Sequence, residues 1–257
     1  MTTLEVLFAP AEFSALNQRD LSETVCVVFD VLRATSSMAT ALANGAEAII
    51  PVADIPEALA IRDARPEVLL AGERNGVRIE ANLTGSISFD LGNSPREFTP
   101  ELIHGRTIVM STTNGTRALR ACAGARAVLA CCFLNLRATA DSVLHLGPQH
   151  LLLVCSGTLK EAAYEDALGA GAFCDLVWHQ FTSGDIADSA GMARRLFHLA
   201  HKDLFSAFSA SRNGKRLLAR ADLKEDVSFC AQVDRLQLVA ELAKGEVRKQ
   251  RSVGTIV

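Results

Sequence analysis

Carboxylate and arginine side chains recur directly after short apolar segments of this chain. Asp30 ends one such segment and is followed by Arg33, and Glu73 stands beside Arg74 after another. Carboxylates can hold a hard metal ion such as Mg²⁺, and the planar guanidinium group of arginine can donate two parallel hydrogen bonds to an oxyanion. These residues therefore suit a site that binds an anion beside a metal ion.

Further polar groups follow other apolar segments. Asn93 and Ser94 precede a proline, and Glu165 and Asp166 stand near the start of a predicted helix. A run of small polar residues follows the segment 107–110 and includes Thr112, Thr113, Asn114, Gly115 and Thr116. Hydroxyl, amide and backbone N–H groups at the start of a helix can bind an anion. We therefore add these residues to the candidate site.

Each of these groups also has a purely structural explanation. Asp30 and the segment 111–116 could cap the helices that they precede, and Glu165 with Asp166 could interact with a helix dipole. The segment 94–97 has the composition of a capping box, with proline at the first helical position. Ligands of open α/β sheets bind beyond the carboxyl ends of the strands. Four polar strand ends together therefore favour a functional site over four unrelated caps.

The elements that position these residues can be predicted from the apolar pattern. Strands are predicted at 25–29, 47–52, 68–71, 107–110, 127–131 and 151–155, and helices between them at 34–44, 56–64, 116–123 and 138–146. The strands are apolar throughout and do not alternate, which is typical of burial on both faces in a parallel sheet. Strands that alternate with helices predict an α/β fold.

The last third of the chain is predicted to be mainly helical. Helices are expected at 161–181 and 187–199, and a mixed segment at 202–218 is expected to break at Asn213-Gly214. The basic tail, 244–257, has a weak preference for β-structure. No Pro/Ser-rich linker or fixed-period repeat occurs. We therefore predict a single α/β domain over residues 1–257 with a helical C-terminal third.

The composition excludes several classes of protein. The formal net charge is −3, and aromatic residues make up 5% of the chain, so we expect no nucleic-acid partner and no membrane surface partner. The N-terminus lacks the pattern of a signal peptide, and no apolar run is long enough to span a bilayer. The seven cysteines lack the spacing of a disulfide framework or zinc site. We expect reduced, mostly buried thiols in a cytoplasmic protein.

Several motifs together resemble the 2-phosphosulfolactate phosphatase family. They are, in order, 30–35 (Asp-Val-Leu-Arg-Ala-Thr), 43–46 (Ala-Asn-Gly-Ala), 72–74 (Gly-Glu-Arg), 90–95 (Asp-Leu-Gly-Asn-Ser-Pro) and 112–116 (Thr-Thr-Asn-Gly-Thr). The similarity continues through 155–157, 165–166, 188–190 and Asp226. Two departures are Ser156, where the family usually has alanine, and 35–37 (Thr-Ser-Ser), where threonines are usual. Neither departure changes a carboxylate or an arginine.

The resemblance implies a fold and an activity. The fold would be a three-layer α/β/α arrangement with a mixed, largely parallel sheet. The activity would be the Mg²⁺-dependent hydrolysis of the phosphate monoester of 2-phospho-3-sulfolactate to 3-sulfolactate and phosphate, a step in coenzyme M biosynthesis. Asp30, Glu73, Glu165 and Asp166 are the candidate metal ligands, and Asp30, Glu73 and Arg33 the candidate catalytic residues. Arg33, Arg74 and the hydroxyl and amide groups named above would bind the substrate.

The residue at position 32 bears on the mechanism. Phosphatases of the haloacid dehalogenase type also begin with an apolar strand that ends in aspartate, but they need a second aspartate two residues later. This chain has Leu32 there. We therefore prefer direct attack by a metal-activated water, while the assignment of metal-binding and water-activating carboxylates stays open.

Two other functions and a homodimer are also compatible with the sequence. The same chemistry could act on another small phosphorylated acid, or the chain could bind an anion without turnover. The apolar fraction of 49% suggests a homodimer. Its interface would use the aromatic residues of the helical third, which are Phe173, Trp178, Phe181, Phe197, Phe205 and Phe208. The alternative is that these aromatic residues pack the helical layer onto the sheet.

Overall fold

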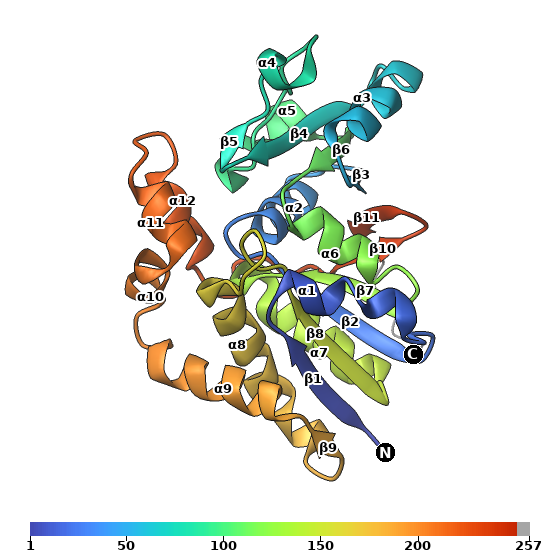
Figure 1. The fold of residues 1–257 in the computed structure, drawn as a ribbon, viewed down its shortest axis with the longest axis vertical. Coiled ribbons are helices and arrows are strands. Elements are labelled where there is room, and N and C mark those ends of the chain that lie inside the picture. Colours follow the sequence, from blue (N-terminus) through green and yellow to red (C-terminus); the bar gives the residue numbers. More distant parts are fainter. Residues whose placement is uncertain (251–257) are drawn as a thin grey trace.

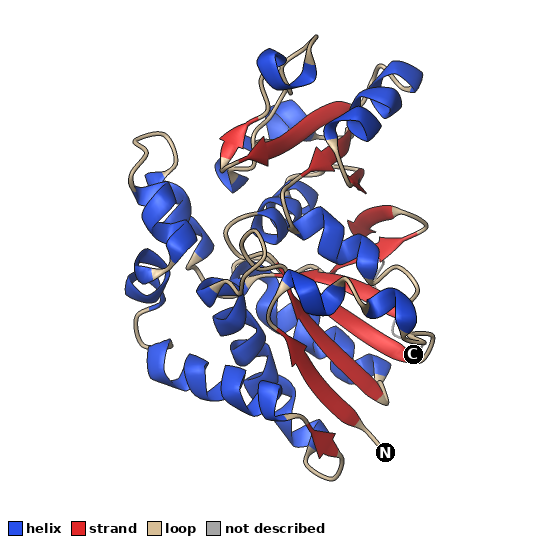
Figure 2. Cartoon of the chain, viewed as in Figure 1, coloured by secondary structure: helices blue, strands red, loops and turns tan. Residues whose placement is uncertain are grey.

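A twisted sheet of eleven strands runs through the middle of the protein (Figures 1 and 2). The computed structural model describes residues 1–250. The strand order is β5 (Val77–Arg78), β4 (Leu69–Arg74), β6 (Thr107–Ser111), β3 (Ala48–Val52), β11 (Glu246–Lys249), β10 (Ala240–Ala243), β7 (Ala127–Cys131), β2 (Thr24–Phe29), β8 (His150–Cys155), β1 (Thr3–Leu7) and β9 (Asp185–Ile186).

Two parallel blocks make up most of the sheet. One contains β4, β6 and β3, and the other contains β7, β2, β8, β1 and β9. The hairpin β10–β11 lies between them and is antiparallel to both neighbours. Its turn is formed by Lys244 and Gly245, both with positive φ, as the favoured two-residue hairpin turns require. The two parallel blocks therefore run in opposite directions, which makes the sheet mixed and largely parallel.

Helices cover both faces of the sheet (Figure 2). The helices are α1 (Pro10–Phe13), α2 (Ala34–Ala43), α3 (Ile55–Ala64), α4 (Ala81–Thr84), α5 (Pro100–Ile103), α6 (Gly115–Ala121), α7 (Leu136–Leu146), α8 (Tyr164–Phe181), α9 (Asp188–Ala200), α10 (Leu204–Ala210), α11 (Arg212–Leu218) and α12 (Lys224–Cys230). Short 3₁₀ segments occupy Leu16–Gln18, Pro95–Glu97 and Phe133–Asn135. The result is the three-layer α/β/α arrangement.

The central strands supply side chains to two separate hydrophobic cores. In β2, Val25, Val27 and Phe29 pack into the core that includes α7, α8 and α9, whereas Cys26 and Val28 pack toward α2 and α6. All five side chains are buried. A strand buried on both faces must be apolar at every position, and this explains the unbroken apolar segments in the sequence.

The six predicted strands and the four helices between them are confirmed, with small shifts at their ends. The predicted helix 161–181 begins at Tyr164, and the predicted helix 187–199 is α9. The strand β1 was not predicted. The predicted tail forms the second strand of a hairpin up to Lys249, while its residues 251–257 lie outside the described part.

The predicted break at Asn213-Gly214 is wrong. The chain breaks at Ser211, whose side-chain oxygen accepts a hydrogen bond from the Gly214 N–H (3.0 Å) and caps the following helix. Asn213 and Gly214 lie inside α11. Glycine is needed there because a Cβ atom at position 214 would collide with the Phe208 carbonyl group of α10. In this pair, Gly214 therefore permits the close contact with α10 and Asn213 contributes a polar side chain to a pocket, and neither residue forms a turn.

The aromatic residues expected at a dimer interface lie mainly in the core. Phe173, Phe181 and Phe208 are fully buried, while Trp178 and Phe197 are partly buried against the same core. The alternative explanation, packing of the helical layer onto the sheet, therefore accounts for most of them. All seven cysteines are buried and free, as predicted. Within residues 1–250, no helix combines the length and the apolar character needed to cross a bilayer.

Candidate active site

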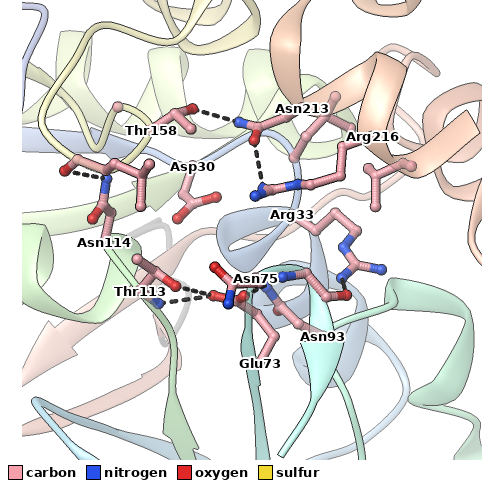
Figure 3. A pocket seen from close by; sticks show the side chains of 15 residues that line it. Asp30, Arg33, Glu73, Asn75, Asn93, Thr113, Asn114, Thr158, Asn213 and Arg216 are labelled. Carbon is pink, nitrogen blue, oxygen red and sulfur yellow. Dashed lines mark hydrogen bonds between the residues drawn. The ribbon is translucent and has the colours of Figure 1, made fainter. Parts of the chain in front are cut away.

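A polar pocket lies between residues of the two parallel blocks and α11 (Figure 3). Residues that follow β2, β4, β6 and β8 all reach it, although the blocks run in opposite directions. Its polar lining consists of Asp30, Arg33, Glu73, Asn75, Gly76, Asn93, Thr113, Asn114, Gly157, Thr158, Asn213 and Arg216. The structure thus brings Asp30, Arg33, Glu73, Asn93, Thr113 and Asn114 of the predicted site into one pocket.

Three carboxylates lie near the end of β2 and at the start of α8; Asp30 lines the pocket, whereas Glu165 and Asp166 are buried and are not part of its lining. Asp30 is half-buried, and its Oδ1 accepts a hydrogen bond from the Ala34 N–H (3.1 Å) at the start of α2. Asp166 is buried and accepts from the N–H groups of Val31 (2.8 Å) and Gly157 (3.0 Å). These bonds join α8 to the ends of β2 and β8. Glu165 is also buried, and one of its oxygens, Oε2, has no hydrogen-bond partner.

Burial and mutual repulsion disfavour negative charge on these groups. Burial is the largest cause that raises the pKa of Asp30, to about 6, and the neighbouring carboxylates Glu73 and Glu165 raise it further. The pKa of Asp166 is raised well above its usual range by burial and by Asp30 and Glu165. A cation in this part of the pocket would relieve both effects. The site is therefore electrostatically prepared for positive charge.

Glu73 occupies the end of β4 and is held by three donors. Its Oε1 accepts from the Thr113 N–H and hydroxyl groups (2.8 Å each), and its Oε2 accepts from the Gly76 N–H (2.6 Å). Figure 3 shows the Thr113 contacts directly. Thr113 follows β6, so these bonds fix the carboxylate against the neighbouring strand end. Gly76 has a φ of +79°, which favours glycine.

Arg33 is almost fully buried between the pocket and α12. Its Nη1 donates to Asp226 (2.6 Å), and its Nη2 donates to the Gly76 carbonyl oxygen (2.7 Å). Asp226 also accepts from the Ser94 hydroxyl (2.7 Å) and the Arg96 Nε–H (2.9 Å). Asp226 thus joins three segments that are far apart in the sequence. The Ser94 hydroxyl is bound to Asp226, while Glu97 accepts from the Ser94 N–H (3.3 Å) as in a capping box.

Several predicted substrate-binding residues do not line the pocket. Arg74 donates to the Glu73 carbonyl oxygen (2.7 Å) and to the Ser111 hydroxyl (2.9 Å), so its guanidinium group lies against β6. Thr112 and Thr116 hydrogen-bond to each other at the start of α6. Gly115 lies directly beside Asp30, and a Cβ atom there would collide with that carboxylate. Their substrate contacts stay predictions.

Sequence reasoning missed the part of the pocket contributed by α11. The Asn213 side-chain amide donates to Thr158 Oγ1 (2.7 Å) and to Glu165 Oε1 (2.6 Å), and its oxygen accepts from Arg216 (2.6 Å; Figure 3). The Asn213-Gly214 pair is the sequence feature that could have indicated this contact, but its composition is more typical of a helix break. Asn75 and Thr158 were missed as well, because each lies in a turn beyond the motif residues.

The fit to a magnesium ion can be judged from the carboxylates. Within residues 1–250, no three His, Cys, Asp or Glu side chains form a ready ligand set for a metal ion. Mg²⁺ usually takes only one or two carboxylates and completes its shell with water and substrate phosphate. Asp30 at the pocket and the unpartnered Oε2 of Glu165 agree with that requirement. Glu73 and Asp166 are already held by backbone donors.

Sequence comparisons show the family to which the chain belongs. A family model for 2-phosphosulpholactate phosphatase matches residues 12–245. A probable 2-phosphosulfolactate phosphatase of Caldanaerobacter subterraneus subsp. tengcongensis is 37% identical over 238 residues, which are 92% of this chain and 95% of the relative. A protein of the same description from Thermotoga petrophila is 39% identical over 219 residues, 85% of this chain and 89% of the relative. The chain therefore belongs to the 2-phosphosulpholactate phosphatase family, whose described members are phosphoric monoester hydrolases.

Proposed function

We propose that this protein hydrolyses the phosphate monoester of 2-phospho-3-sulfolactate to 3-sulfolactate and phosphate with Mg²⁺ as cofactor. Family membership supports the phosphatase activity. The observation that carries the proposal is the pocket itself, in which the carboxylates Asp30 and Glu73 face a common space with Arg33. A phosphate ester needs both a cation and fixed donors, and this pocket has residues for both.

Asp30 and Glu165 would hold the magnesium ion. When bound, the ion supplies charge neutralisation of the phosphoryl oxygens and an activated water. The carboxylate of Asp30 is positioned by the Ala34 N–H (3.1 Å), and that of Glu165 by the Asn213 amide (2.6 Å). The pKa of Asp30 is raised to about 6, first by burial and then by the neighbouring carboxylates, and a bound cation would counter both effects.

Other residues of the pocket would bind and orient the phosphate ester. Arg33 presents positive charge from a buried position that Asp226 fixes. Glu73 holds the turn at Thr113 through two hydrogen bonds of 2.8 Å, and Asn114 is held by the carbonyl oxygens of Ser156 and Leu159 (3.1 and 3.3 Å). We propose direct attack by water, since position 32 is leucine and offers no second carboxylate.

Phosphate release from 2-phosphosulfolactate tests the proposed function. We expect release that requires Mg²⁺, is abolished by a chelator and is restored by excess Mg²⁺. Release from another small phosphorylated acid, but not from 2-phosphosulfolactate, would replace the substrate and keep the chemistry. A protein that binds such anions without releasing phosphate would be a binding protein. A role in coenzyme M biosynthesis, a cytoplasmic location and a homodimer stay predictions.

A further inference from the structure

Arg216 is the second arginine of the pocket, and no sequence motif singled it out. It lies on α11, and its side chain extends toward the middle of the pocket, on the side of Asp30 (Figure 3). The residue is exposed, unlike Arg33. Its guanidinium group also lies close to Gly76, since a Cβ atom added there would be 3.6 Å from the Nε atom of Arg216. Arg216 therefore stands at the mouth of the site and beside the turn that follows β4.

The two arginines differ in how their charge is balanced. Arg33 forms a buried ion pair with Asp226 (2.6 Å) and uses a second arm on the Gly76 carbonyl oxygen. Arg216 donates one hydrogen bond, to the uncharged amide oxygen of Asn213 (2.6 Å). None of the ion pairs formed within residues 1–250 involves Arg216. Its positive charge and most of its donors are therefore available to a ligand.

The position of Arg216 is fixed by the network behind it. Asn213 donates to both Thr158 Oγ1 and Glu165 Oε1, which orients its amide oxygen toward Arg216. The Ser211 cap and the tight contact of Gly214 with α10 fix the backbone of this helix. A side chain that is held in place before binding loses less entropy when a ligand arrives. Arg216 is thus prepared to receive an anion at the mouth of the pocket.

We propose that Arg216 is a specificity residue that binds an acidic group of the substrate other than the phosphate. This inference rests on the proposed function, in which the substrate carries a carboxylate and a sulfonate besides the phosphate ester. The magnesium ion would be bound by carboxylates of the site and by the phosphate. Arg33 already forms an ion pair with Asp226. The carboxylate and the sulfonate of the substrate are then both without a cation, and the planar fork of the unpaired Arg216 guanidinium suits either of them.

The test compares three phosphate esters of similar size. 2-Phosphosulfolactate carries both acids, 2-phospholactate carries only the carboxylate, and glycerol 2-phosphate carries neither. For Arg216→Gln, we expect the preference for 2-phosphosulfolactate over glycerol 2-phosphate, measured as the ratio of kcat/KM values, to fall about 10- to 100-fold. If the preference over 2-phospholactate falls equally, the sulfonate is the group bound; if that preference is unchanged, it is the carboxylate.

Arg212→Gln is the matched control. Arg212 lies on the same helix, loses the same charge and pairs with Glu161 at the exposed surface, so we expect it to keep the wild-type preference. An equal loss on all three esters in Arg216→Gln would make Arg216 a positioning residue and would overturn the proposal. So would a preference that remains unchanged.

A binding measurement separates this proposal from the proposed function. Calorimetric titration with 3-sulfolactate requires no turnover, and we expect Arg216→Gln to bind it about tenfold or more weakly than wild type and Arg212→Gln do. If wild type releases no phosphate from any of the esters but shows this difference, the proposed function fails while Arg216 remains an acid-binding residue. Equal affinity of the three proteins would refute the role of Arg216.

Discussion

The two walls of the pocket differ in what holds their polar side chains in position. One wall consists of the strand ends that carry Asp30 and Glu73, and it is acidic. The other consists of α11 and α12, where Arg216 extends into the pocket and Asp226 holds Arg33 in place. Groups of the strand wall are fixed mainly by backbone N–H donors within a few residues or on the adjacent strand. Groups of the helical wall are fixed by other side chains, either on the same helix, as Arg216 by Asn213, or far away in the sequence, as Arg33 by Asp226.

The difference has a chemical consequence. Backbone donors hold a carboxylate rigidly without neutralising it, so the strand wall keeps its negative charge for a cation. In the helical wall, Asp226 forms an ion pair with Arg33 and fixes its position, whereas Arg216 donates only to an uncharged amide oxygen. We expect substitutions in the strand wall to affect the chemical step and substitutions in the helical wall to affect substrate selection.

Asp30→Asn should have the largest effect on activity. The change keeps the shape of the side chain and its bond to the Ala34 N–H, but removes the charge that would hold Mg²⁺. We expect kcat to fall on the order of 10³-fold, as loss of metal-ion stabilisation worth several kcal/mol implies. Steady-state kinetics over a range of Mg²⁺ concentrations measures this. Retention of kcat with unchanged Mg²⁺ dependence would show that the strand wall does not hold the metal.

The same variant should be more stable than wild type when no metal is present. The pKa of Asp30 is about 6 in the folded protein, compared with an ordinary value of 3.8 that we take for the unfolded chain. Between these two pH values the folded state therefore holds a proton that the unfolded chain has released. The free energy of unfolding therefore falls as pH rises through this window and stays lowered above it. In a chelator, we expect the Tm of Asp30→Asn to exceed that of wild type by about 3 °C at pH 8, with a smaller difference near pH 4. A lower Tm at pH 8 would indicate a structural role.

Replacement of Arg33 and of Arg74 should show which of the two arginines acts in the pocket. Arg33→Lys loses the fork that joins Asp226 to the Gly76 carbonyl oxygen, and we expect kcat/KM to fall about 100-fold. Arg74→Lys changes contacts with the Glu73 carbonyl oxygen and with Ser111 of β6, away from the pocket lining, and we expect a loss of less than about tenfold. Equal losses in both variants would show that Arg74 also reaches the substrate. Near-normal kinetics of both would remove the arginines from the site.

Asp226→Asn should have a smaller effect than Arg33→Lys. The amide can still accept a hydrogen bond from Arg33, but the buried ion pair is lost, and we expect KM to rise about tenfold with little change in kcat. Initial rates over a range of substrate concentrations separate the change in KM from the change in kcat. Asp222→Asn is the control, since Asp222 pairs with Arg220 at the exposed surface. A fall in kcat as large as that in Asp30→Asn would place Asp226 in the chemical step.

The fold and the strand wall were predictable because their signals are local. Apolar segments of five or six residues identify strands buried on both faces, and a polar residue that follows each strand lies at its carboxyl end by construction. Asp30, Glu73 and Thr113 were found in this way. The reversal of direction between the two blocks was not predictable, since it depends on where the hairpin β10–β11 inserts.

The helical wall could not be predicted by the same rule. Asn213 and Arg216 reach the pocket because α11 packs across it, and no residue near them in the sequence indicates that contact. Asp226 belongs to the residues that carry the family resemblance. Its hydrogen-bond partners Arg33, Ser94 and Arg96, however, are more than 120 residues away in the sequence and could not be predicted. The positions of Asn213 and Arg216 depend on tertiary contacts that leave no local signature, so sequence patterns did not identify these two residues.

The place of β10–β11 also has a consequence for the order in which the chain can fold. These strands are the last ones described, yet they lie between β3 and β7 in the middle of the sheet. During synthesis, each parallel block can form while the hairpin is still inside the ribosome, and both β3 and β7 then present an open edge. Open edges invite pairing with other chains. The nascent protein is therefore most exposed to aggregation just before the hairpin emerges, when the two halves of the sheet are complete but not yet joined.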